Sequence, residues 1–101
     1  MKHAKASIAG RLAVARSLAK PALPARELDR LAGLHQGHVW AIESGHRPNI
    51  ETDTCIALAK VLGVSLDWLL TGEGDAPDAD AVRAAVQTAR ETSDARDSQV
   101  G

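Results

Sequence analysis

The chain has 101 residues, of which 45% are apolar, and it contains two tryptophans but no phenylalanine or tyrosine. A chain of this length supports one hydrophobic core, which must be built here from Leu, Ile, Val and Ala around the tryptophans. Ala and Leu are strong helix formers, so the composition favours an all-α fold. The single cysteine, Cys55, excludes an internal disulfide and a Cys-x-x-Cys motif, and it indicates a reducing, cytoplasmic location.

The net charge of −1 conceals two segments of opposite sign. Residues 1–70 carry nine Lys and Arg against six Asp and Glu, a net charge of +3, whereas residues 71–101 carry three against seven, a net charge of −4. We therefore predict a basic domain over residues 1–74 and an acidic C-terminal tail over residues 75–101. The tail is expected to be solvated; the alternative role is an electrostatic brake on non-specific binding of nucleic acid.

The first 26 residues contain six basic and no acidic residues, as many targeting peptides do. Arg11 and Arg16 interrupt any apolar run in this segment, however, and no stretch of the chain reaches the roughly 20 residues of a membrane span. We interpret the segment as part of the fold and expect no membrane association.

Helical periodicity predicts a first helix from about Ala4 to Lys20, which Pro21 ends. A second helix is expected to begin near Pro24, whose fixed φ suits a first turn, and to run to Ala32. Gly33 supplies the break that follows.

The third predicted helix runs from Gln36 to Ser44 and turns Val39 and Ile42 toward the core. The fourth extends from about Glu51 to Leu62, and Gly63 is placed as its left-handed cap. A short fifth helix, Leu66 to Thr71, follows a Ser65 cap and returns Trp68 to the core.

Beyond residue 74, a helical period continues from Asp78 through Val82 and Val86. The apolar stripe is small and rich in alanine, so we expect its burial to contribute little and the helix to fray before Ser98.

Two short helices joined by a tight glycine turn form the helix-turn-helix arrangement, whose second helix fits the major groove of B-DNA. The chain carries one continuous pattern of this kind: Leu28-x4-Gly33-Leu34-x4-Val39-x2-Ile42-Glu43-x-Gly45-x2-Pro48, then Leu58-Ala59-x2-Leu62-Gly63-Val64-Ser65-Leu66-Asp67-Trp68-Leu69-Leu70-x-Gly72. This pattern resembles the phage repressor and Cro type of helix-turn-helix and the larger xenobiotic-response-element group of bacterial regulators. The resemblance covers about residues 8 to 72. It implies a five-helix, lambda-repressor-like DNA-binding domain, usually dimeric, acting on an operator with approximate two-fold symmetry.

Carried onto this sequence, the resemblance implies a recognition helix that begins at Gln36, with Gly37, Trp40 and Ala41 on the groove side. Gln36 is the expected base reader, because its amide can pair bidentately with adenine; the alternative is a solvated first-turn residue. Trp40 either contacts a thymine methyl or the sugar-phosphate wall, or it packs on a neighbouring helix or on a partner protein, and we favour packing or partner contact. The remaining candidates for DNA contact surround this helix: Arg26, His35, His38, His46, Arg47 and Asn49.

The sequence departs from the family pattern at three positions. Asp29 stands where the family usually has Ala, His35 replaces a frequent Ser or Thr cap, and Ala25 replaces a phosphate-binding Gln. Because Gly37 and Ala41 offer no hydrogen-bonding side chain, direct readout must depend on few residues, with help from phosphate contacts and DNA shape.

The resemblance also implies an ion pair between Arg16 on the first helix and Glu43 at the end of the recognition helix. A glutamate at a helix C-terminus conflicts with the helix dipole and needs a compensating cation.

A zinc site from His35, His38, His46 and Cys55 is the less favoured interpretation, because Cys55 occupies an apolar position of the fourth helix. The chain has no phosphate-binding glycine loop and no nucleophile motif, so we predict neither an enzyme nor a cofactor.

The sequence thus predicts a cytoplasmic, nucleoid-associated transcription regulator, a repressor that binds double-stranded DNA as a homodimer. The alternative is a protein-interaction module, such as an antitoxin or adaptor, with weak or no DNA binding. The dimer surface is expected either on the fifth helix around Trp68 and Leu70 or on the tail stripe at Val82 and Val86.

Overall fold

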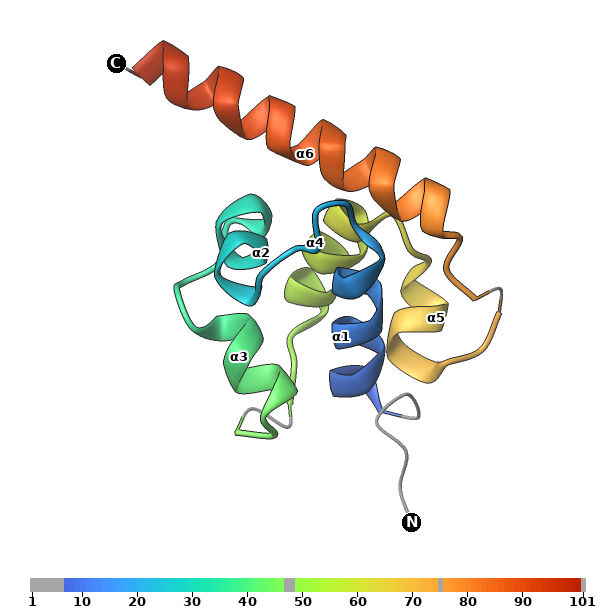
Figure 1. Ribbon diagram of the computed structural model, residues 1–101. Coiled ribbons are helices and arrows are strands. Elements are labelled where there is room, and N and C mark those ends of the chain that lie inside the picture. Colours follow the sequence, from blue (N-terminus) through green and yellow to red (C-terminus); the bar gives the residue numbers. More distant parts are fainter. Residues whose placement is uncertain (1–6, 47–48, 75, 101) are drawn as a thin grey trace.

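The computed structural model describes residues 7–46, 49–74 and 76–100. These residues form six helices, joined by turns and loops, and no strand. The helices are α1 (Ile8–Leu18), α2 (Ala25–Ala32), α3 (His38–Glu43), α4 (Thr52–Leu62), α5 (Leu66–Thr71) and α6 (Ala79–Val100). The predicted all-α fold is confirmed. Helices α1 to α5 form a bundle, and the long helix α6 crosses one end of it (Figure 1).

Local signals account for most helix boundaries. The Ser65 hydroxyl accepts a hydrogen bond from the Trp68 N–H at 3.0 Å, as an N-cap should, so the predicted start of α5 is confirmed. Gly63 ends α4 with a left-handed φ of 67°, which also agrees with the prediction. Helix α1 begins at Ile8 after a Ser7 cap and ends at Leu18; the predicted start at Ala4 lies outside the described residues.

All six helices contribute to the core, which is built mainly from aliphatic side chains. The largest fully buried side chains belong to Leu12, Leu23, Leu28, Leu58, Leu62, Leu69, Val39, Val82, Val86, Asp29 and Cys55. Trp68 is also buried, as predicted, at 8% exposure. Cys55 packs as a small apolar side chain, and burial raises the pKa of its thiol.

Helix α6 differs from its prediction. It runs to Val100 instead of fraying before Ser98, and it buries Val82 and Val86, at 0% and 1% exposure, against the bundle. Both valines are completely buried because α6 packs on α4, α1 and α2 at once. A stripe of only two valines can therefore attach α6 to the bundle, because the hydrophobic contribution of a side chain increases with the apolar area that it buries.

Polar contacts hold α6 in place beside these valines. The Arg90 guanidinium donates to both carboxylate oxygens of Glu27 on α2, at 2.9 and 3.1 Å, and to the Pro21 carbonyl at 3.2 Å. Arg83 donates to the carbonyl of Leu18 at the end of α1, at 3.1 Å. Helix α6 is thus fastened to both α1 and α2.

Candidate nucleic-acid interface

Helices α2 and α3 pack together across a tight turn. Gly33 caps α2 with a φ of 73°, and the following Leu34 N–H donates to the Asp29 carbonyl at 2.8 Å. This left-handed ending reverses the chain within a few residues, a conformation that glycine adopts without a Cβ clash. Val39 and Ile42 of α3 face the core, at 0% and 2% exposure, as predicted. The opposite side of α3 is therefore directed outward.

Helix α3 begins at His38, two residues later than predicted. Its start is set by Asp29 of α2, whose carboxylate accepts hydrogen bonds from the Gly37 and Val39 N–H groups, each at 2.8 Å. Asp29 is only 2% exposed. Gly37, the N-cap residue of α3, has a φ of 92° and offers no capping side chain. Because α3 begins at His38, Gln36 lies in the turn before the helix.

Sequence reasoning identified Asp29 as a departure from the family pattern but missed its role. Local periodicity gives no signal for a cap that comes from another helix, eight and ten residues earlier than the N–H groups it binds. A carboxylate at a core position, with a glycine in the following turn, is the only signal in the sequence that could have indicated it.

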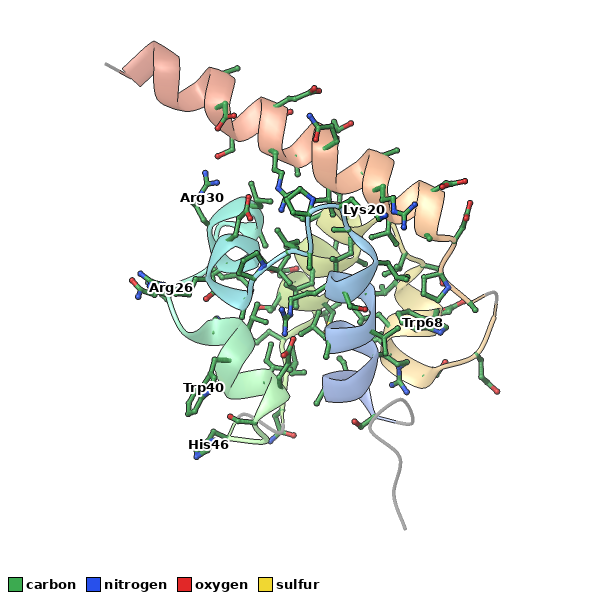
Figure 2. The ribbon with its side chains drawn as sticks, viewed as in Figure 1. Lys20, Arg26, Arg30, Trp40, His46 and Trp68 are labelled. Atoms are coloured by element: carbon green, nitrogen blue, oxygen red, sulfur yellow. The ribbon has the colours of Figure 1, made fainter. Side chains whose placement is uncertain are left out.

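The outward side of α2 and α3 gathers several of the predicted DNA-contacting residues. Figure 2 shows the side chains of Arg26, Trp40 and His46 on this side of the molecule, away from Trp68. Gln36, His35, His46, Asn49 and Arg26 are exposed, whereas Gly37, His38 and Ala41 are half-buried. Arg47 lies outside the described residues.

Trp40 is the most exposed of the large apolar side chains in the described part of the chain, at 60%. Its ring stacks on that of His46, with the ring centroids 5.0 Å apart and the planes inclined by 23°. The His46 Nδ1 in turn lies 2.7 Å from the Ser44 hydroxyl. These contacts hold an aromatic surface at the outer side of α3.

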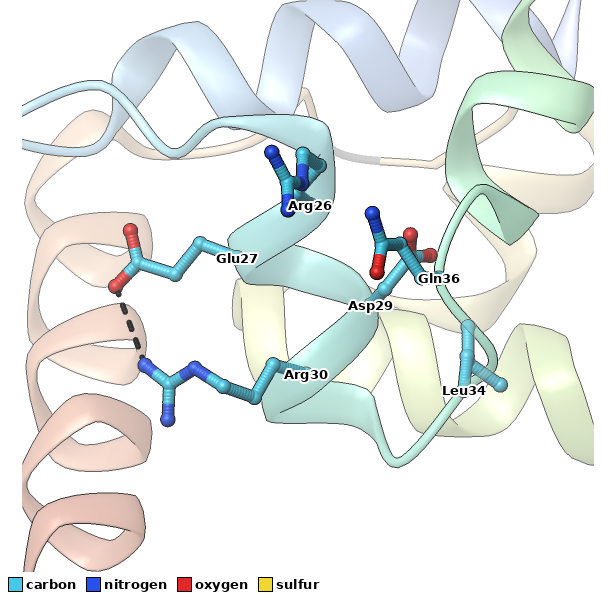
Figure 3. A pocket seen from close by; sticks show the side chains of 6 residues that line it. All are labelled: Arg26, Glu27, Asp29, Arg30, Leu34 and Gln36. Atoms are coloured by element: carbon cyan, nitrogen blue, oxygen red, sulfur yellow. Dashed lines mark ion pairs between the residues drawn. The ribbon is translucent and has the colours of Figure 1, made fainter.

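A depression of about 430 Å³ lies between α2 and the turn before α3. Arg26, Glu27, Asp29, Arg30, Leu34 and Gln36 line it (Figure 3). Arg30 is 3.9 Å from the Glu27 carboxylate, while Arg26 forms no ion pair with the described residues. An arginine and an amide therefore border the same exposed hollow.

Arg16 and Glu43 lie together beneath this surface. The Arg16 guanidinium donates to both carboxylate oxygens of Glu43, at 2.6 and 2.8 Å, and to the Leu23 carbonyl at 2.9 Å. The hydrogen bond to Glu43 raises the pKa of Arg16. The pair ties the end of α3 to α1 and to the loop before α2.

Residues 22–69, which include this turn and both of its helices, match the helix-turn-helix family. Over these residues the protein has a helix-turn-helix of the phage repressor and Cro type. Domains of this family are DNA-binding regulators, and they are generally not enzymes. No curated protein and no solved structure matches the chain.

The helix-turn-helix domain leaves few apolar side chains for contact with another copy. Leu70 on α5 is 43% exposed, but Trp68 is buried in the core. Val82 and Val86, which mark the alternative surface expected on the tail, are buried against the rest of their own chain. Among the described residues, no helix has the length and hydropathy needed to cross a membrane.

Proposed function

We propose that this protein is a sequence-specific transcription repressor that binds a pseudo-palindromic operator as a homodimer, at the bacterial nucleoid. The observation that carries the proposal is the outward face of α2, the turn and α3. That face presents Gln36, Trp40 and Arg26 to solvent, while the opposite face of α3 is held in the core. A surface of this shape fits the major groove.

In this proposal, Gln36 reads a base edge and the basic residues around it bind the DNA backbone. An amide can pair bidentately with adenine, whereas contacts to phosphate fix the register without distinguishing sequences. The hollow beside Arg26 and Gln36, with a volume of about 430 Å³, is the proposed position of a backbone phosphate. The same role is proposed for His35, His38, His46, Arg47 and Asn49.

The small size of the reading surface supports the proposed homodimer. Helix α3 has six residues. Two residues of the expected groove side, Ala41 in the helix and Gly37 directly before it, have no polar side chain. One copy therefore reads few bases, and two copies on half-sites about 34 Å apart would specify a longer operator. The exposed Leu70 of α5 supports a dimer surface on that helix.

Duplex DNA from upstream of the protein's own gene provides the test, with binding followed by fluorescence anisotropy at increasing salt. The logarithm of affinity should fall with the logarithm of salt by roughly 0.9 per phosphate neutralised. Gln36→Ala should lower the preference for the operator over mutated sequences, by about 1–3 kcal/mol, and leave the salt slope intact. Arg47→Ala is the matched control, because it should weaken all sequences alike and make the slope shallower. Absence of binding at low salt would contradict the proposal.

A second candidate function is a protein-interaction module, and the exposure of Trp40 is the observation that favours it. Aromatic side chains often anchor protein interfaces. Trp40→Ala separates the two functions. A shift in preference at a thymine position indicates DNA contact, whereas loss of a co-purifying protein with no DNA affinity in the parent chain indicates the interaction module.

A further inference from the structure

The start of the recognition helix depends on a residue that does not face the proposed DNA surface. Asp29 is 2% exposed, and its two carboxylate oxygens each accept one N–H group from the first residues around α3. Helix N-termini leave N–H groups without partners inside the helix, and those groups need acceptors from elsewhere. In this chain the acceptor belongs to α2.

Within the turn before α3, the His35 carbonyl accepts a hydrogen bond from the His38 N–H at 3.1 Å, whereas the Gly37 and Val39 N–H groups bind the Asp29 carboxylate of α2. The residue at the N-cap is Gly37, whose φ of 92° is adopted freely by glycine but rarely by other residues, and which has no side chain to accept a hydrogen bond. His35, at the position where the family frequently has Ser or Thr, is exposed. The position at which α3 begins is therefore fixed by a contact between helices.

We propose that Asp29 is the positioning residue of the DNA-reading surface. By binding the Gly37 and Val39 N–H groups, it holds the helix start at His38 and keeps Gln36 in the preceding turn (Figure 3). The direction in which Gln36 meets a base edge depends on this start, since Gln36 would take helical backbone dihedrals if the helix began there and has a turn conformation as it stands. The proposal rests on the proposed function, because it assigns specificity to a residue that acts through Gln36.

A consequence is that the two N–H groups are not available to a DNA phosphate. In other helix N-termini such groups bind anions directly. Here both are already bonded at 2.8 Å, so contacts to the backbone fall to side chains such as Arg26. Operator discrimination should thus be sensitive to Asp29 although Asp29 itself touches no DNA.

The first experiment measures amide hydrogen exchange by NMR in the wild type and in Asp29→Asn. The amide of Asn keeps one acceptor oxygen and replaces the other by an NH2 group, so one of the two N–H groups loses its partner. Exchange at Gly37 or Val39 should quicken about tenfold or more. Ser65→Ala is the matched control, since it removes the cap of α5 and should leave both of these amides slow.

The second experiment measures the affinity ratio between the operator and mutated duplexes. Asp29→Asn should reduce this ratio by about fivefold or more, because the bidentate contact of Gln36 is misplaced. The double variant Asp29→Ala with His35→Ser restores a cap at the position usual in the family. It should regain the melting temperature of the wild type but not its operator preference, whereas His35→Ser alone, which removes only a proposed phosphate contact, should keep that preference.

Slow exchange together with an unchanged affinity ratio in Asp29→Asn overturns the proposal, as does a double variant that recovers the wild-type preference. Ser65→Ala must keep the wild-type ratio, and an equal loss there would also overturn it. A wild-type chain that binds no duplex at low salt overturns the proposed function and the reading role of Asp29 with it. In that case the exchange rates of Gly37 and Val39 still decide whether Asp29 caps α3.

Discussion

At the scale of single residues, two arginines of α1 bind groups at the C-terminal ends of two other helices, which lie far from them in the sequence. Arg11 donates to the Leu69 and Leu70 carbonyls at the end of α5, each at 2.9 Å, and Arg16 binds Glu43 at the end of α3. The last carbonyls of a helix have no partner within it, and the negative end of the dipole favours a cation. Helix α1 thereby fixes the C-terminal ends of two neighbours.

Loss of either member of the Arg16–Glu43 pair should destabilise the fold. The side chains are 22% and 17% exposed, so the remaining partner would be left partly buried without its counter-charge. We expect Arg16→Met and Glu43→Gln each to lower the free energy of unfolding by roughly 1.5–3 kcal/mol in urea denaturation. The double variant should lose less than the sum of the two.

Lys20→Met serves as the control for the loss of an exposed cation and should stay within about 0.5 kcal/mol of the wild type. If Arg16→Met and Glu43→Gln both have the same midpoint urea concentration of unfolding as the wild type, the ion pair has no structural role.

At the scale of helices, Gly63 joins the end of α4 to the packing of α6. A Cβ at this position would lie 2.6 Å from the Ala85 Cβ and 3.0 Å from the Ala81 carbonyl oxygen, both on α6. Gly33 ends α2 in nearly the same backbone conformation, with φ of 73° against 67°, but has nothing within 4 Å of its Cβ position. The two glycines therefore differ mainly in the neighbouring helix.

We predict that Gly63→Ala destabilises the protein more than Gly33→Ala does. Each substitution places a Cβ at positive φ, at a cost of about 1–2 kcal/mol. Gly63→Ala must in addition displace α6, which should add roughly 1–3 kcal/mol, as overpacking usually does. Equal melting temperatures for the two variants would show that α6 does not pack closely over the end of α4.

The contact between α2 and α6 should make stability depend on pH. The hydrogen-bonded Arg90 guanidinium lowers the pKa of the Glu27 carboxyl group from its ordinary value of 4.5. A carboxyl group with a lower pKa in the folded state contributes stability above its unfolded pKa and loses it as the pH falls through the folded pKa.

Arg90→Met should consequently cost most near neutral pH, and the difference from the wild type should narrow from about pH 6 to about pH 3 in urea denaturation. Arg83→Met is the control: its partner on α1 is the Leu18 carbonyl, which does not titrate in this range, and its ion pair with Asp80, at 3.7 Å, joins a carboxylate that is 91% exposed and should contribute little. A difference for Arg90→Met that is constant with pH would mean that the pair with Glu27 is not maintained in solution.

At the scale of the whole molecule, α6 belongs to the same packed core as the helix-turn-helix domain. Its two valines are completely buried, and Arg90 reaches Glu27 across 63 residues of sequence. Removal of residues 75–101 should therefore expose apolar surface on α4 and lower the melting temperature, since each buried valine contributes about 1.5 kcal/mol or more.

Val82→Ala and Val86→Ala test this in the full chain, without truncation. Each should reduce the free energy of unfolding by about 1–2.5 kcal/mol in urea denaturation, by loss of transfer energy and by the cavity left behind. A truncated chain with the melting temperature of the wild type would show instead that α6 contributes nothing to the core.

The sequence by itself determined the features that depend on near neighbours. Ser65 and Gly63 mark helix ends through contacts within a few residues, and Val39 and Ile42 show by their spacing which face of α3 is buried. The family pattern, which covers about residues 8 to 72, also located the helix-turn-helix, and residues 22–69 match that family. These signals are local, so no knowledge of the packing was needed to interpret them.

Only the tertiary structure decided where α3 begins and how α6 is held. The capping carboxylate of Asp29 comes from another helix, and the burial of Val82 and Val86 depends on the surface that α4, α1 and α2 form together. Local propensity predicts that α3 begins at Gln36 and that α6 is a marginally stable helix that frays before Ser98. Contacts between residues far apart in the chain override both tendencies, because an unsatisfied N–H group or an exposed apolar face costs more free energy than a weak local preference.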